Sequence, residues 1–310
     1  MATVAITDKN GRFIKPCPGT PKHICCGYWI IDFAHGCPLG CSYCILNHYF
    51  GKGNITLYRN TDKIYEEIND FLQGSEEITR FGTGEFTDSL VFENEYPLYH
   101  ELVPLIANSD TAVLEIKTKT VNIEQLLKLK HRDHIIVSWS LNSDYIARSQ
   151  ETRAPSIKTR ISAANRIQNE GYKLAFHFDP IIIHKGWENE YRKTIDLLFE
   201  KIDREKIIYI SMGTLRYPPD MRRDISTTEI GAGEFIQGSD KKFRYFRPIR
   251  TEVYRKIKEF LLQHVDEDII YLCMESQVVW EDVFNISMSS EGLKERLDSA
   301  CVNKFKLLYN

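Results

Sequence analysis

The stretch "HGCPLGCSYCILNHYF", residues 35–50, places Cys37, Cys41 and Cys44 in a C-x3-C-x2-C pattern. Structural zinc sites normally use four protein ligands, so these three cysteines fall one short. Iron–sulfur clusters are also held by cysteine thiolates, and three thiolates on a four-iron cluster leave one iron open to a small molecule. The spacing therefore favours an open iron–sulfur cluster. A zinc site completed by a distant fourth ligand is the alternative.

Outside this motif, short apolar segments that resemble buried strands alternate with amphipathic segments that resemble helices. Repeated alternation of this kind predicts βαβ units around a parallel sheet. No G-x-G-x-x-G follows the first strand, and the cysteine loop occupies the first βα connection instead. We therefore expect an α/β fold, a full or partial (β/α) barrel with its active site at the C-terminal strand ends, rather than an open doubly wound sheet. The strands are expected at 27–35, 77–85, 111–119, 133–142, 172–180, 206–214 and 268–276, and the helices at 61–74, 122–131, 154–171, 187–202 and 251–264.

The chain is expected to divide into a cysteine-rich N-terminal arm (1–26), a barrel core (27–230) and a C-terminal α/β extension (231–310) that completes the same domain. Its 40 Lys and Arg against 43 Asp and Glu give a formal charge of -3, which does not indicate a strongly basic nucleic-acid binder. No apolar run approaches the ~20 residues of a membrane span, and no secretion signal is visible. We expect a cytoplasmic protein whose thiols stay reduced.

The cysteine motif, with Tyr43 before its last cysteine, resembles that of the radical S-adenosylmethionine (SAM) superfamily. The stretches "FTDSL", "SWSLN", "GYKLAFHFDPII", "ISMGTLRY" and "YLCMES" extend the resemblance to spore photoproduct lyase and its relatives, over about residues 27–280. The resemblance implies a [4Fe–4S] cluster that binds SAM through its open iron and cleaves it to a 5′-deoxyadenosyl radical. It also implies an external electron donor of the flavodoxin or ferredoxin type.

Polar side chains gather near the predicted C-terminal ends of the strands. Because residues two apart share a strand face, we interpret these polar faces as directed toward the cofactor, with water-facing edge residues as the alternative. The cofactor-facing candidates are Lys119, Ser140, Asn142 and His177.

By family resemblance, Tyr43, Lys119 and Ser140 would contact SAM. The stretch "GTGE" (82–85) resembles the motif that meets the SAM ammonium, with Gly84 permitting close approach of the backbone and Glu85 supplying an acceptor. The alternative for this stretch is a strand-end turn with a solvated glutamate.

The sequence departs from the spore photoproduct lyases of spore-forming bacilli at two points. Those proteins carry a hydrogen-donor cysteine after the second strand and a second tyrosine just after the last cluster cysteine. Here "GTGEFTDS" (82–89) holds no cysteine, and Ile45 stands at the tyrosine position. Only Tyr43 is left as a catalytic candidate from that relay.

The remaining cysteines allow three interpretations. Cys17, Cys25 and Cys26 precede the first strand, and Cys273 ends a late one. These four could hold an auxiliary iron–sulfur cluster, Cys273 could replace the missing hydrogen donor, or all could be buried free thiols. Cys301 is expected to pack in the core.

A basic stretch with interleaved aromatic residues, "DKKFRYFRPIRTEVYRKIK" (240–258), suits contact with phosphates and stacked bases. Its candidate substrate residues are Arg244, Tyr245, Arg247 and Arg250; a solvated helix entry is the alternative. The family resemblance thus implies a radical SAM enzyme acting on DNA thymine lesions or another nucleotide. The alternatives are an enzyme of the same scaffold that modifies a peptide or small metabolite and a non-catalytic metal-binding module.

Overall fold

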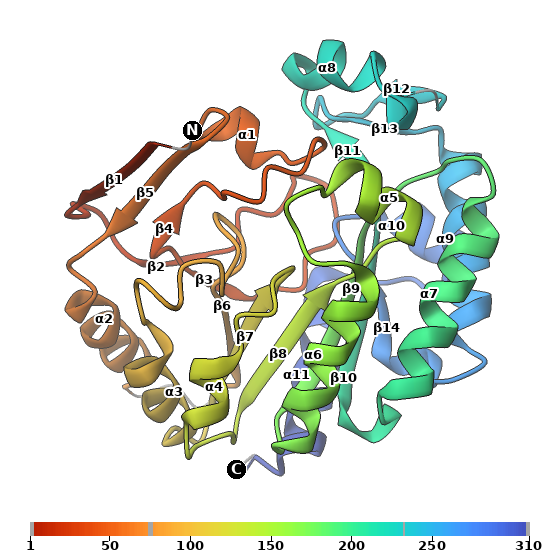
Figure 1. Cartoon of the computed structure of the whole chain (residues 1–310). Coiled ribbons are helices and arrows are strands. Elements are labelled where there is room, and N and C mark those ends of the chain that lie inside the picture. Colours follow the sequence, from red (N-terminus) through yellow and green to blue (C-terminus); the bar gives the residue numbers. More distant parts are fainter. Residues whose placement is uncertain (1–2, 74–76, 232, 308–310) are drawn as a thin grey trace.

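A computed structural model describes residues 3–73, 77–231 and 233–307. Its centre is a curled eight-stranded sheet with the order β14-β10-β9-β8-β7-β6-β3-β2, in which every neighbouring pair is parallel except β2 with β3 (Figure 1). This half-barrel confirms the predicted α/β fold in its partial form. The strands are β2 (Ile14–Pro16), β3 (Trp29–Ile31), β6 (Thr79–Gly82), β7 (Ala112–Thr118), β8 (Ile135–Ser140), β9 (Lys173–Ile181), β10 (Ile207–Thr214) and β14 (Ile270–Leu272).

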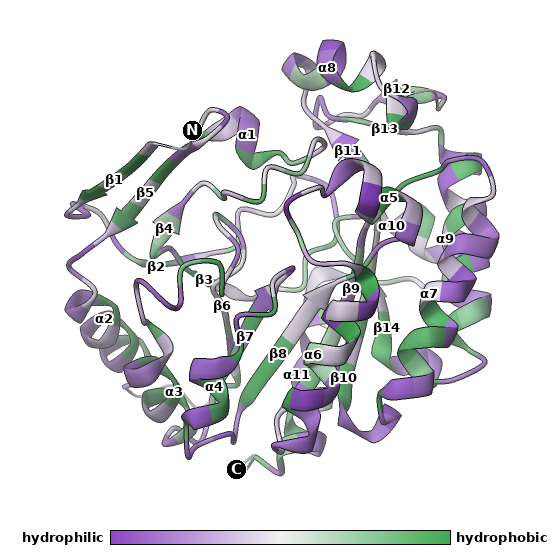
Figure 2. Ribbon diagram, in the orientation of Figure 1, coloured by the Kyte–Doolittle hydropathy of each residue, from purple (hydrophilic) through white to green (hydrophobic). Residues whose placement is uncertain are grey.

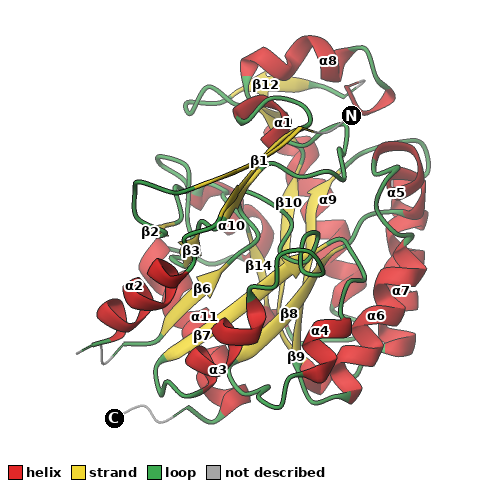
Figure 3. Ribbon diagram, turned by 60° about the vertical axis from the view of Figure 1, so that its left-hand side comes forward, coloured by secondary structure: helices red, strands yellow, loops and turns green. Residues whose placement is uncertain are grey.

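Helices cover the outer face of the sheet (Figure 3). Helix α6 (Ile157–Asn169) shows why they form: Ser156 caps its N-terminus by accepting a hydrogen bond from the Thr159 N–H, and Ile157, Ile161 and Ala164 share its buried face. The other covering helices are α3 (Tyr99–Ala107), α4 (Glu124–Lys128), α7 (Trp187–Lys201), α9 (Arg247–Leu261) and α11 (Ser290–Phe305). Helix α2 (Asp62–Leu72) confirms the helix predicted at 61–74, although its predicted stop, Gly74, lies outside the described residues.

The sheet changes character along its strands. Strand β8 is buried throughout, but it begins with Ile135, Ile136 and Val137 and ends with Ser138 and Ser140. Figure 2 shows β8 changing from hydrophobic (green) at its start to an intermediate hydropathy (near white) at its C-terminal end. The N-terminal half of β8 therefore belongs to the apolar core, and its C-terminal half places polar serine side chains inside the half-barrel.

The strand predicted at 27–35 is interrupted. It divides into β3 and β4 (Ala34–His35), which belong to different sheets. At the corner, the buried Asp32 carboxylate pairs with Lys9 at 2.8 Å, Lys15 at 2.5 Å and His35 at 2.8 Å. A carboxylate with these partners cannot sit on the apolar face of a continuous strand, so the prediction of one unbroken strand was wrong.

Two small sheets stand above the C-terminal ends of the half-barrel strands (Figure 1). One joins β1 (Thr3–Thr7), β5 (Asn54–Tyr58) and β4, and the other joins β11 (Arg216–Tyr217), β13 (Phe243–Tyr245) and β12 (Phe235–Gln237). Neither was predicted, because strands of two to five residues leave too short a pattern in the sequence.

Both ends of the chain contribute to the central sheet. Strand β2 comes from the predicted N-terminal arm and β14 from the predicted C-terminal extension. The arm then crosses to the opposite sheet edge, where the Ile24 N–H donates to the Glu275 carbonyl at 2.8 Å. Within the described ranges, no helix has the length and apolar character needed to cross a membrane.

Candidate active site

The cysteine loop leaves β4 at a turn that requires glycine. Gly36 has φ +80°, and a Cβ there would lie 2.0 Å from the Asn54 carbonyl oxygen. Its N–H donates to the Phe86 carbonyl at 2.9 Å, which ties the loop to the connection after β6. This turn carries Cys37 onto the C-terminal side of the half-barrel, and the loop ends at α1 (Leu46–Tyr49).

All three thiols of the cysteine loop are at least partly buried. Cys41 is buried, while Cys37 and Cys44 are partly exposed. Burial raises the pKa of all three thiols, to about 12 for Cys41, and the neighbouring Lys119 acts in the opposite direction on Cys41 and Cys44. Three thiol donors on one short loop are the ligand chemistry of an iron–sulfur cluster. The residues present therefore fit the cluster that the sequence predicts.

A pocket of about 240 Å³ lies beside this loop at the C-terminal strand ends. Six predicted residues line it together, namely Tyr43, Cys44, Gly84, Glu85, Lys119 and Ser140. The same pocket is also lined by side chains that were not assigned to a site from the sequence, namely Lys117, Asp179, Arg216, Lys242 and Met274. Most of the residues that strand alternation and the family resemblance selected as SAM candidates thus line one cavity.

A buried ionic network fixes the loop against the sheet. The Glu151 carboxylate follows α5 (Asp144–Gln150) and accepts a hydrogen bond from the Tyr43 hydroxyl. It also pairs with Lys119 Nζ at 3.3 Å and Arg160 Nη2 at 2.5 Å. Burial alone would raise the pKa of Glu151, but Lys119 and Arg160 lower it to about 2. Arg160 also donates to the Ser140 carbonyl at 3.0 Å, so the network joins the cysteine loop to β8.

Gly84 lines the pocket and also packs closely against β7. A Cβ at this position would lie 2.8 Å from Lys117 Cβ and 3.1 Å from the Lys117 carbonyl oxygen. Glycine is therefore needed so that the loop after β6 can pack against β7. Glu85 lies 3.8 Å from Lys117 Nζ, so at the pocket wall its carboxylate already faces a cation.

Asn142 and His177 do not line the pocket. Asn142 donates to the Pro180 carbonyl at 3.1 Å and accepts from the Ser143 N–H at 3.0 Å and the Tyr191 hydroxyl. These partners occupy its side chain, which is fully buried. The structure thus gives Asn142 a structural role in place of the expected cofactor contact.

His177 lies deeper in the half-barrel. Its ring nitrogens contact Glu115 at 2.5 Å and Ser211 at 2.6 Å, and Glu115 also accepts from Ser138 at 2.6 Å and Tyr209 at 2.8 Å. The polar side chains of neighbouring strands therefore form hydrogen bonds with one another inside the half-barrel. The expectation that His177 faces the cofactor is replaced by this network.

The far end of the pocket carries an ion pair beside a thiol. Arg216 binds the Asp179 carboxylate through two contacts, at 3.1 and 3.0 Å. Its Nη2 lies 3.9 Å from Cys273 Sγ, directly behind the pocket wall. Burial raises the pKa of Cys273, so the sulfur keeps its proton.

The predicted substrate residues are mostly internal. Arg244 is 3% exposed and pairs with Asp240 at 2.6 Å, Tyr245 is fully buried, and Arg250 pairs with Glu275 at 3.2 Å. These three side chains are therefore buried and do not form an exposed substrate surface, although Nε and Nη2 of Arg244 have no hydrogen-bond partner among the described residues.

Two other basic residues near this stretch have different positions. Arg247 is exposed and lies 3.7 Å from Asp282. Lys242 reaches the pocket, and nothing in the sequence set it apart from the other basic residues of the stretch.

The N-terminal arm folds over the pocket mouth. Thr20 Oγ1 lies 3.3 Å from the Met274 sulfur and 3.2 Å from Lys242 Nζ. The pKa of the Cys25 thiol is raised, chiefly by the neighbouring Cys17 thiol, so these two arm thiols lie close together. In the part of the chain that the structure describes, no three Cys, His, Asp or Glu side chains, those of the cysteine loop included, are gathered around a single point as metal ligands.

The cysteine loop supplies the thiol ligands of one cluster, so we expect one cluster per chain. Anaerobic reconstitution should then give about four irons and four sulfides per chain. Colorimetric iron and sulfide assays measure this directly. A value near eight of each would contradict the prediction.

Cys301 is fully buried in the main core, as expected.

The half-barrel and its three-cysteine loop beside a polar pocket define a radical SAM protein. A family model described as spore photoproduct lyase matches residues 24–264, which is most of the chain. The chain belongs to the spore photoproduct lyase family.

Relatives in this family differ in how much they share with the chain. The spore photoproduct lyase of Bacillus subtilis is 30% identical over 200 residues, covering 64% of this chain and 54% of the relative. That of Clostridium acetobutylicum is 23% identical over 255 residues, covering 76% and 72%. The chain thus spans about half the length of the Bacillus relative.

Solved structures agree on the fold. A spore photoproduct lyase mutant with bound AdoMet and dinucleoside spore photoproduct superimposes with a TM-score of 0.77 at 22% identity, covering 88% of this chain and 82% of that one. A spore photoproduct lyase complexed with dinucleoside spore photoproduct gives 0.75. At this level of identity the likeness shows a shared half-barrel.

Proposed function

We propose that this chain is a radical SAM lyase that acts on a thymine lesion in DNA or on a related nucleotide. The observation that carries the proposal is the single pocket shared by Cys44, Tyr43 and the predicted SAM contacts. The names of the family and of its relatives support the reaction class. We place the activity in the cytoplasm, where cysteine ligands stay reduced.

Cys37, Cys41 and Cys44 would hold a [4Fe–4S] cluster, and SAM would occupy the pocket beside Cys44. Bound together, these cofactors supply the 5′-deoxyadenosyl radical. The chain's own residues position SAM: Lys119 and Glu85 offer charges of opposite sign at the wall, which suits a ligand carrying both a carboxylate and an ammonium group.

The substrate would bind in the part of the pocket that its basic residues line. Lys117, Arg216 and Lys242 place three cations around this part of the pocket, against the carboxylates of Asp179 and Glu85. Cations at the mouth of a pocket suit the phosphate of a nucleotide. This favours the nucleotide over a peptide or an uncharged metabolite.

The activity is tested by anaerobic incubation of reconstituted protein with SAM, reductant and DNA that carries spore photoproduct. We expect 5′-deoxyadenosine and repaired thymine, identified by mass spectrometry. SAM cleavage without any change in the DNA would leave the radical SAM assignment and overturn the substrate. The absence of both products would overturn the whole proposal.

Cys273 is our candidate hydrogen donor, because the cysteine found after the second strand in relatives is missing here. In the proposed step, one hydrogen atom moves from the Cys273 S–H bond to a substrate carbon radical. A thiol in the assay then restores the S–H bond by giving up a hydrogen atom. Cys273→Ala should therefore keep SAM cleavage but lose most of the repaired product, because alanine has no S–H bond to supply the hydrogen atom.

Cys17→Ala is the matched control, since it also removes a partly exposed thiol near the pocket mouth. Product analysis by mass spectrometry distinguishes the two variants. Normal repair by the Cys273→Ala protein would exclude the donor role.

A further inference from the structure

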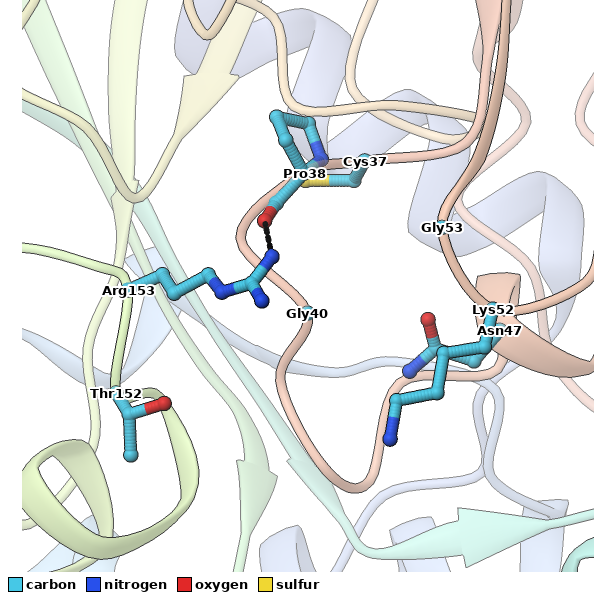
Figure 4. Close-up of a pocket in the computed structure, with 8 residues that line it drawn as sticks. All are labelled: Cys37, Pro38, Gly40, Asn47, Lys52, Gly53, Thr152 and Arg153. Atoms are coloured by element: carbon cyan, nitrogen blue, oxygen red, sulfur yellow. Dashed lines mark hydrogen bonds between the residues drawn. The ribbon is translucent and has the colours of Figure 1, made fainter. Parts of the chain in front are cut away.

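Two pockets open on the cysteine loop, and they differ in the sulfur atoms that they offer. The first has a volume of about 360 Å³, and Figure 4 shows Cys37 in its wall beside Arg153, which donates to the Pro38 carbonyl at 3.2 Å. Cys37 would be a ligand of the cluster, and none of the other described residues in this wall carries sulfur. At the SAM pocket, Met274 lies in the wall, and the adjacent Cys273 is a thiol outside the cysteine loop. Of the two, the SAM pocket thus has the thiol that the cluster leaves free.

The Cys273 thiol is held from two sides. Cys273 follows β14, and its backbone N–H donates to the Met212 carbonyl on β10 at 2.8 Å. Its sulfur accepts a hydrogen bond from Arg216 Nη2 at 3.9 Å. Because sulfur is a weak acceptor, this contact keeps its geometry only if the guanidinium is itself fixed.

An ion pair fixes the Arg216 guanidinium. Its Nη1 and Nη2 donate to the two carboxylate oxygens of Asp179 on β9 at 3.1 and 3.0 Å. Both side chains are largely buried, at 13% exposed for Arg216 and 14% for Asp179. A planar guanidinium bound through two parallel hydrogen bonds has a defined orientation, so the same Nη2 stays directed at the sulfur.

The ion pair rests on the backbone of β10 at Gly213. A Cβ at this position would lie 2.7 Å from Asp179 Cγ and 2.8 Å from Arg216 Nη1, so the pair fits because residue 213 is glycine. The preceding residue, Met212, is the one whose carbonyl anchors Cys273. Strand β10 therefore brings the ion pair and the thiol to adjacent points.

The direction of the hydrogen bond leaves the thiol hydrogen free. A guanidinium has N–H donors and no acceptor, so the Cys273 S–H cannot be donated to Arg216. Burial raises the pKa of Cys273, and the nearby Asp179 carboxylate acts in the same direction, so the thiol keeps its hydrogen. Arg216 thus holds the sulfur without occupying the S–H bond.

We propose that Arg216, held by Asp179 against Gly213, is the positioning residue of the hydrogen donor: it fixes Cys273 Sγ and leaves the S–H bond available to a substrate radical. In the donor step the S–H bond breaks, the hydrogen atom forms a C–H bond on the substrate, and Cys273 becomes a thiyl radical. A thiol in the assay then returns a hydrogen atom to Cys273. The inference rests on the proposed function, because it requires Cys273 to be the donor.

The test compares the reconstituted wild type with Arg216→Lys and Asp179→Asn at saturating DNA. Lysine keeps the positive charge but cannot form the paired hydrogen bonds to Asp179, and asparagine keeps the guanidinium but weakens its anchor. Mass spectrometry counts repaired product per 5′-deoxyadenosine formed. This ratio should fall severalfold in both variants, because the substrate radical then meets a misplaced thiol.

Two controls separate positioning from the other uses of a basic residue. Lys242→Met removes another cation of the same pocket and should raise the KM for DNA without changing product per 5′-deoxyadenosine. Arg153→Met removes the arginine of the first pocket, which lies on the same loop but is not a partner of Cys273, and should leave the ratio unchanged.

The metal-free protein gives a readout that does not depend on activity. Subtracting the infrared spectrum of Cys273→Ala isolates the S–H stretching band of Cys273, whose frequency reports the hydrogen bonds of this thiol. The band should shift in Arg216→Lys and stay at the wild-type frequency in Arg153→Met.

An unshifted band or a wild-type product ratio in Arg216→Lys would overturn the positioning role, as would an equal loss of ratio in Lys242→Met or Arg153→Met. The donor role is tested separately by Cys273→Ala. If Cys273→Ala repairs DNA normally, the donor role and this inference fail together. If the ratio falls in Cys273→Ala but not in Arg216→Lys or Asp179→Asn, the positioning role fails alone.

Discussion

Replacing Cys37, Cys41 and Cys44 together with alanine is expected to abolish both the iron–sulfur absorption and the cleavage of SAM. The three thiols are the donors on the loop, and an iron–sulfur cluster is held by cysteine thiolates. Alanine offers no ligand atom, so the triple variant removes all three donors of the loop. Visible absorbance, iron content and 5′-deoxyadenosine release measure the loss.

The control for this experiment is the double variant Cys17→Ala, Cys25→Ala. It removes two thiols from the N-terminal arm and leaves the loop untouched, so it should keep about four irons per chain. Cleavage of SAM by the triple variant above the rate of protein-free solution would show that the cluster is held elsewhere.

Local patterns were enough to find the cluster loop. Cys37, Cys41 and Cys44 lie within eight residues, and their spacing alone indicates shared chemistry. Glu151 and Arg160 carried no such signal. Glu151 meets Tyr43 across 108 positions of sequence, and that contact exists only after the sheet has formed. A buried pair of this kind looks in the sequence like two ordinary surface charges.

Strand parity identified the faces of the strands but not the partners of each side chain. It placed Lys119 and Ser140 in the pocket, and it equally selected Asn142 and His177, whose polar atoms are used by neighbouring strands and helices. Parity fixes the side of a strand on which a residue lies. Whether the residue then meets a ligand or another side chain depends on residues far away in the sequence.

The basic stretch at 240–258 shows the same limit. Arg244 lies directly opposite Arg216 in the β11–β13 pairing, yet Arg244 is enclosed with Asp240 while Arg216 reaches the pocket. Composition predicted a phosphate-binding surface along the whole stretch. The short sheet instead buries Phe243, Arg244 and Tyr245, while Lys242 lies at the cavity.

Removing the charge of Glu151 is the second change for which we expect a large effect. Glu151 and Arg160 have no exposed side-chain surface, and Lys119 is 14% exposed. In Glu151→Gln, two cations remain in the interior without their shared counter-charge. Breaking a buried ion pair in this way typically costs about 3–5 kcal/mol in the free energy of unfolding.

Urea unfolding of the metal-free protein measures this cost. Tyr43→Phe is the matched control, because it removes one hydrogen bond to the same carboxylate and leaves the charges paired, so it should cost less, about 1.5–3 kcal/mol. The double variant should cost less than the sum of the two single losses, since both changes act on one carboxylate. If the free energy of unfolding of Glu151→Gln lies within about 1 kcal/mol of the wild-type value, the carboxylate does not hold the cysteine loop to the sheet. SAM affinity should then also be unchanged, because Lys119 and Tyr43 would keep their positions without it.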